Sequence, residues 1–147
     1  MQSLFNQLFD YNFYCNKTLI AQMQALEKVP EKSKELFSHI LNAHHIWNKR
    51  LLDEHWQYEV WQVHEPSAWE DIHYENQRTT FEIITNTDDF SKRVDYKTTE
   101  GRVFANELKD ILFHIVNHST HHRGQLVMDF RKNKIELSPL DYIYYKR

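Results

Sequence analysis

Residues 106–132, NELKDILFHIVNHSTHHRGQLVMDFRK, carry one continuous helical pattern. Each residue of an α-helix is turned by about 100° from the last, so residues three and four apart share a face. Drawn on such a wheel, the apolar residues gather on one side, and the centre of that side falls between Ile115 and Leu126. The pattern predicts a long amphipathic helix with one buried face.

Four histidines interrupt this helix within nine residues. His122 lies well inside the apolar face and His118 lies at its edge, whereas His114 and His121 turn away. Two imidazoles at positions i and i+4 are one helical turn apart, which suits two ligands of one Zn²⁺ or Ni²⁺ ion. The alternative is a pair of core histidines that bond to carbonyls or carboxylates.

A third ligand is expected from the region before residue 54, which holds His39, His44 and His45. On the helical wheel His44 lies about 40° from the apolar centre, His39 lies about 100° from it, and His45 points away. The wheel alone therefore favours His44, although helix ends and bundle geometry shift such positions by tens of degrees.

Spacings of three and four residues between apolar side chains also predict three other helices. Pro30 separates the first two of them, and Ser67 with Glu70 forms a capping-box pattern at the start of the third. Alternating residues around Thr99-Glu100-Gly101 predict a short β-hairpin before the last helix. The predicted helices span 4–27, 31–53, 67–85 and 106–132.

The composition agrees with an all-α fold. The chain has 147 residues with only 2 glycines and 3 prolines, too few for the many tight turns of a sandwich or barrel. Residues 1–147 are expected to form one domain, a four-helix bundle. The aromatic loop 54–66 is expected to pack over the bundle, and the tail 135–147 is expected to be irregular.

Charge and cysteine content exclude several functional classes. The net charge is -3 and no basic stripe is present, which argues against nucleic-acid binding. No apolar run approaches 18 residues and no signal peptide is recognisable, so no membrane span is expected. A single cysteine, Cys15, is expected to be buried and inert, and it suits a cytoplasmic protein.

Three further positions on the predicted helices carry expectations. Gly124 lies opposite the apolar face, where it is either simply tolerated or allows close approach by another backbone, such as a second subunit. Arg50 and Arg123 are interpreted as surface charges rather than supports of a site.

Several short motifs resemble those of the DinB family. Residues 114–125, HIVNHSTHHRGQ, closely resemble the family signature. Residues 11–16, 39–50 and 139–143 are similar to its first-helix, second-helix and closing motifs. The resemblance therefore covers nearly the whole chain, and the motif of the last long helix is the specific part of it.

The resemblance implies an up-down-down-up four-helix bundle. It also implies a metal ion held by His39, His118 and His122, so that His39 takes the place that the wheel gives to His44, with His44 as the substitute. Homodimers are common in the family. The resemblance also implies a metalloenzyme, because similar proteins of the wider group resemble transferases or isomerases that use a low-molecular-weight thiol, and some are hydrolase-like.

Two functions follow as expectations. In the first, the chain is a metal-dependent transferase or hydrolase that acts on a small molecule. No general base is assigned, although Asp53 and Glu54 follow the second helix and Asp129 is expected to pair with the tail or the first helix. In the second, the chain is a non-catalytic metal-binding protein, stress-responsive and damage-inducible as the family name suggests.

Overall fold

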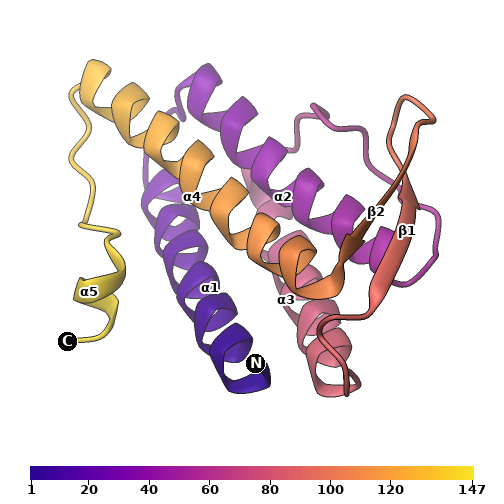
Figure 1. Ribbon diagram of the computed structural model, residues 1–147. Coiled ribbons are helices and arrows are strands. Elements are labelled where there is room, and N and C mark those ends of the chain that lie inside the picture. Colours follow the sequence, from indigo (N-terminus) through magenta and orange to yellow (C-terminus); the bar gives the residue numbers. More distant parts are fainter.

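Four long helices dominate the computed structural model, which describes residues 1–147 (Figure 1). A two-stranded sheet precedes the last of them, a 3-10 turn at Pro66–Ala68 precedes the third, and a short helix lies near the C-terminus. The elements are α1 (Gln2–Gln24), α2 (Glu31–Leu51), α3 (Trp69–Thr85), β1 (Arg93–Lys97), β2 (Val103–Glu107), α4 (Leu108–Lys132) and α5 (Tyr142–Tyr145).

Contacts between the helices fix their directions. His44 of α2 meets Thr80 of α3, and Phe37, earlier in α2, packs on Trp69, earlier in α3, so these two helices run parallel. In contrast, Ser33 at the start of α2 bonds to Asp129 near the end of α4, so α2 and α4 are antiparallel. The bundle is therefore up-down-down-up, as the sequence resemblance implied (Figure 1).

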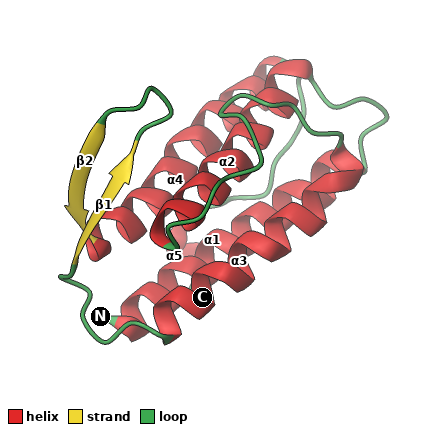
Figure 2. Cartoon of the chain, turned by 90° about the vertical axis from the view of Figure 1, so that its right-hand side faces the viewer, coloured by secondary structure: helices red, strands yellow, loops and turns green.

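The predicted hairpin is confirmed. Strands β1 and β2 pair antiparallel with Asp95 opposite Ala105, and they lie beside α2 and α4 (Figure 2). The predicted capping box is wrong, because Ser67 lies within the 3-10 turn and α3 begins at Trp69 without a side-chain cap. The Pro66 ring fixes the first position of that turn.

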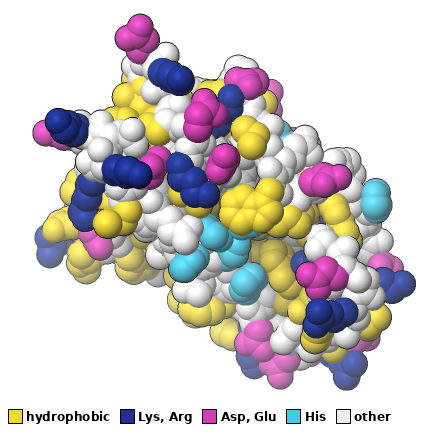
Figure 3. Space-filling view, turned by 90° about the horizontal axis from the view of Figure 1, so that it is seen from above, with side chains coloured by type: hydrophobic (Ala, Val, Ile, Leu, Met, Phe, Trp, Pro, Cys, Tyr) yellow, Lys and Arg dark blue, Asp and Glu magenta, His cyan; other side chains and the backbone are white.

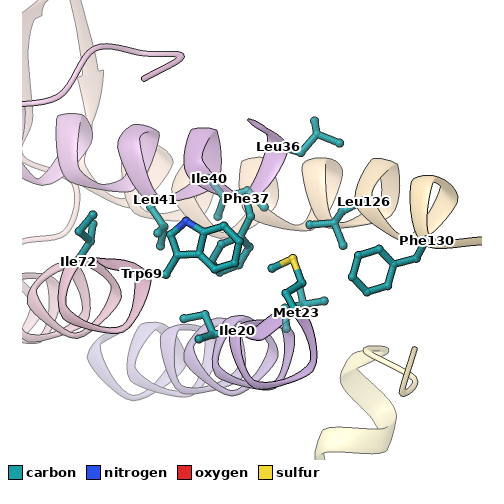
Figure 4. Close-up of a cluster of buried hydrophobic side chains, with 11 residues drawn as sticks. Ile20, Met23, Leu36, Phe37, Ile40, Leu41, Trp69, Ile72, Leu126 and Phe130 are labelled. Atoms are coloured by element: carbon teal, nitrogen blue, oxygen red, sulfur yellow. The ribbon is translucent and has the colours of Figure 1, made fainter. Parts of the chain in front are cut away.

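Two apolar clusters form the core, one toward each end of the bundle. The Trp69 cluster joins all four long helices (Figure 4) and contains Leu19, Ile20, Met23, Leu36, Phe37, Ile40, Leu41, Trp69, Ile72, Leu126 and Phe130. The Phe90 cluster lies nearer the hairpin and contains Phe5, Phe9, Ile83, Ile84, Phe90, Leu108, Ile111, Leu112, Ile115 and Val116. No helix combines the length and apolarity that a bilayer span requires.

A layer of buried polar side chains lies between the two clusters. His44 is 2 % exposed, and its Nε2 lies 2.7 Å from the Thr80 hydroxyl. That hydroxyl also lies 2.9 Å from the acceptor oxygens of Asn48 and Asn76, so its hydrogen is already shared with them. His44 Nε2 therefore donates to Thr80, and the ring is held neutral and facing α3.

Acid is expected to weaken this layer. Burial lowers the pKa of His44 to about 3 and that of His73 to about 4. In the unfolded chain both rings take up protons near pH 6.5, so below that pH the unfolded state binds more protons. The contribution of these two rings to the free energy of unfolding is therefore fully present above about pH 6.5 and is lost toward pH 4. Between pH 7 and pH 5.5 the free energy of unfolding falls by about 1 kcal/mol for each ring.

Urea unfolding at pH 7 and pH 5.5, with a chelator present, measures this loss. His44→Gln removes one titrating ring, so its loss between the two pH values is expected to be about 1 kcal/mol smaller than that of the unchanged chain. His55→Gln, at an exposed position, serves as the control and keeps the full loss. If the free energy of unfolding fell equally in all three proteins, His44 would not be a source of the acid sensitivity.

Candidate metal centre

Three imidazoles from two helices converge on one side of the bundle. His39 comes from α2, whereas His118 and His122 lie one turn apart on α4. One ring nitrogen of each histidine lies within 4.8 Å of those of the other two. The Nε2 atoms of His39 and His118 are 3.2 Å apart. The antiparallel contact of α2 with α4 thus brings together residues 79 positions apart.

Hydrogen bonds on the far side of two rings fix their orientation. His39 Nδ1 lies 2.9 Å from the Val60 carbonyl oxygen, and His122 Nδ1 lies 2.7 Å from Gln125 Oε1. Both oxygens are acceptors, so each Nδ1 carries the hydrogen and donates it. The Nε2 atom of each ring is then free of hydrogen. Metal-ligating histidines commonly show this arrangement, in which the second nitrogen is tied to an oxygen.

The loop between α2 and α3 covers the cluster. The Trp61 ring stacks on His39, with centroids 3.8 Å apart and planes 8° from parallel. Trp61 itself is 55 % exposed, so the loop reaches the histidines rather than only sealing the apolar core. Figure 3 shows histidine side chains gathered on one face of the molecule beside hydrophobic ones. The cluster is therefore reachable from solvent.

The cluster favours neutral imidazoles. Burial, followed by the nearby His122 and His39 rings, lowers the pKa of His118 to about 3. Burial also lowers the pKa values of His39 and His122, although the bond to Gln125 works in the opposite direction at His122. A metal ion binds only the unprotonated ring, so the ring nitrogens are available at neutral pH without loss of a proton.

The other histidines of the two helices lie outside this group. His44, which the wheel favoured, faces α3 and bonds to Thr80. His114 packs edge-on against Trp47 with ring centroids 5.2 Å apart, and His121 is exposed. The structure therefore brings together the three histidines that the family resemblance selected.

The expected acidic and basic side chains lie elsewhere. Asp53 and Glu54 follow the end of α2, roughly 18 Å along the helix axis from His39, and Glu54 pairs with Lys49. Asp129 bonds to Ser33 of α2 at 2.7 Å, so the expectation of a partner in the tail or the first helix is wrong. None of these carboxylates approaches the cluster.

Two arginines were expected at the surface, and both expectations need correction. Arg50 is only partly exposed, and its guanidinium lies 4.5 Å from the Trp47 ring centroid and within 5.6 Å of those of Trp56 and Tyr96. Arg123 is 3 % exposed. The helices that carry these arginines, α2 and α4, each pack against more than one neighbouring element. A helical wheel that assumes a single buried face therefore misplaces side chains on the second packed side.

Sequence reasoning missed three residues of the site. Gln125 had a usable signal, because it lies three positions after His122 and therefore on the same side of the helix. The Val60 carbonyl and the Trp61 ring had none, since a loop contact to a helix far away in sequence leaves no periodic pattern.

The donor set fits a divalent transition metal. Three imidazole nitrogens suit Zn²⁺, Ni²⁺ and related ions, and no thiol, carboxylate or fourth histidine joins the group. Three protein ligands leave at least one coordination position for another molecule, which is the pattern of catalytic rather than structural zinc sites.

Comparison with known proteins places the chain in a family. No curated protein matches it. Residues 18–146, which include the last turns of α1, all of α2, α3 and α4, and the three clustered histidines, match the DinB family. Because this match extends over nearly the whole sequence, the chain belongs to the DinB family.

Proposed function

We propose that this protein binds one divalent metal ion, Zn²⁺ or Ni²⁺, through His39, His118 and His122, and acts with it as an enzyme on a small molecule. The observation that carries the proposal is the convergence of three neutral imidazoles from two helices. The Nε2 atoms of His39 and His122 carry no hydrogen, because the Nδ1 atom of each ring donates to an oxygen. Membership of a metal-associated family supports it.

An enzymatic role is favoured over a structural one by what surrounds the three rings. A divalent ion held by three histidines supplies Lewis acidity and lowers the pKa of a water or thiol bound beside it. The group contains no fourth protein ligand that would seal the ion. A low-molecular-weight thiol is the proposed co-substrate, and transfer or hydrolysis is the proposed reaction class.

The same loop that covers the cluster also borders a groove. This loop groove has a volume of about 920 Å³ and lies between residues 55–62 and Thr99 at the hairpin tip. Trp61 lines it and also stacks on His39, so the loop groove and the cluster share this ring. We assign substrate binding to this groove, where Trp56, Tyr58 and Trp61 offer apolar and aromatic walls.

Metal content of protein purified without an affinity tag tests the binding part of the proposal. About one ion per chain is expected in the unchanged protein and much less in His122→Ala. His121→Ala is the matched control, because it removes the neighbouring exposed histidine, and it should keep the ion. An unchanged protein that takes up neither Zn²⁺ nor Ni²⁺ when these are added would refute the proposal.

Ligand exchange on the Co²⁺-loaded protein tests the catalytic part. Titration with a low-molecular-weight thiol is expected to produce a new thiolate-to-cobalt absorption band, because a coordination position is open. If the Co²⁺ spectrum is unchanged at saturating thiol, the thiol-dependent proposal fails, and hydrolysis or a non-catalytic metal-binding role, as in a stress-responsive protein, takes its place.

A further inference from the structure

Arg123 is a buried guanidinium on α4 that faces α1, although its neighbour His122 faces α2. Nη1 donates to Oδ1 of Asn12 at 2.6 Å and of Asn16 at 3.0 Å, and Nη2 donates to the Thr120 hydroxyl at 3.0 Å. These bonds use three of the five N–H groups of an arginine. Of the two remaining donors, one has the Tyr11 hydroxyl as its neighbour, because a hydrogen bond between these two side chains affects the pKa of both.

No negative charge compensates Arg123. It takes part in none of the salt bridges of the molecule, and the oxygens that it contacts are neutral. Burial raises the pKa of the nearby Tyr11 to about 12 and also raises the pKa of the Cys15 thiol, so both groups are uncharged at neutral pH. An unpaired buried charge destabilises the fold, and an anionic ligand would relieve that cost.

Arg123 lines a groove on the outer side of α4. This tail groove, about 1050 Å³ in volume, lies between α4 and the C-terminal segment that descends beside α1 (Figure 1). Gly124 leaves it open, since a Cβ added there would meet nothing within 4 Å. Its size suits a small organic molecule. Its apolar lining includes Val127, Met128, Ile135, Leu137 and Leu140.

The lining of the tail groove combines charged, aromatic and apolar side chains. Arg123 and Tyr11 provide a buried cation and an aromatic ring, whose centroid lies 5.7 Å from the guanidinium carbon. Exposed charges of both signs also line it, namely the carboxylates of Glu136 and Asp141 and the guanidinium of Arg131. Half of the lining is hydrophobic, which together with the buried cation favours a ligand with a negative charge and a hydrocarbon body.

We propose that the tail groove binds an organic monocarboxylate, with the carboxylate on Arg123 and the apolar body along Val127, Leu137 and Leu140. The guanidinium has no carboxylate partner in the protein, and a charge-assisted hydrogen bond to the carboxylate of a ligand would supply one. This site is separate from the histidine cluster and does not depend on metal binding.

Calorimetric titration of the full chain, after treatment with a chelator, tests the proposal with three probes. Hexanoate has the charge and the apolar body, hexan-1-ol has only the body, and inorganic phosphate has only the charge. Hexanoate is expected to bind at least about tenfold more tightly than either of the others, because the charged bond and the apolar contact act together. Equal or tighter binding of hexan-1-ol or phosphate would overturn the proposed ligand class.

Variants locate the binding. Arg123→Met is expected to remove the preference for hexanoate over hexan-1-ol, whereas Arg131→Met, which removes an exposed arginine from the same groove, should keep it. Gly124→Leu fills the groove and leaves the bonds of Arg123 in place, so hexanoate should bind at least about tenfold more weakly even if Arg123→Met does not fold. Unchanged hexanoate binding by Gly124→Leu would refute this location.

Discussion

Trp69→Ala is expected to lower the free energy of unfolding by about 3–5 kcal/mol, the usual cost of removing a fully buried large aromatic side chain. Trp69 is 0 % exposed and packs edge-on against Phe37, with ring centroids 4.9 Å apart. In Figure 4 its indole lies between side chains of α1 and α2. Since domains of this size are stable by about 5–15 kcal/mol, this single change removes a large share of the total.

Urea unfolding followed by circular dichroism measures the loss, and Trp61→Ala is its matched control. The same indole is removed there from a position that is 55 % exposed. The control is expected to cost less than about 1 kcal/mol, as most surface substitutions do. Losses of similar size in the two variants would show that the Trp69 cluster does not hold the four helices together.

Addition of Zn²⁺ or Ni²⁺ is expected to raise the melting temperature by roughly 5–10 °C at a free-ion concentration of 100 times the dissociation constant. Binding to the folded state alone contributes about 2.7 kcal/mol under that condition, and 1 kcal/mol shifts the midpoint of such a domain by about 2–4 °C. The expected gain has a structural basis, because the three histidines proposed as ligands lie on α2 and α4, and the site requires both helices to be in place.

His39→Ala is expected to abolish most of this gain, since two imidazoles on one helix remain. His45→Ala, which removes another histidine of α2 outside the cluster, should keep it. Differential scanning calorimetry with and without the ion measures both variants. A gain in His39→Ala as large as in the unchanged chain would show that the ion binds elsewhere.

Most of the fold follows from local sequence patterns. The four predicted helices and the hairpin are present, because their apolar periodicity is the direct result of one buried face per element. The errors are at the ends. The third helix was predicted to begin at Ser67, but Pro66 and the burial of Trp69 set a 3-10 turn first. Helix ends are uncertain by one or two residues when they are predicted from capping patterns.

The candidate site was harder to predict from local sequence patterns than the fold. The helical wheel favoured His44 because it assumes one buried face, yet α2 packs on α3 with one side and on α4 with another. His44 bonds to Thr80 of α3, and His39 lies against His118 of α4. The resemblance to the family resolved this choice, and the structure groups His39 with His118 and His122. Their binding of a metal stays a prediction.

The parallel arrangement of α2 and α3 has a consequence for how this protein can vary. Because α2 has 21 residues, the chain must travel back by about 31 Å before α3 can begin. That return path passes over the histidines and delivers Val60 and Trp61 to His39. The connection between α2 and α3, which the parallel arrangement of these helices requires, therefore also forms one side of the histidine cluster. Shortening this connection would therefore alter the path between α2 and α3 and the surroundings of the histidines together.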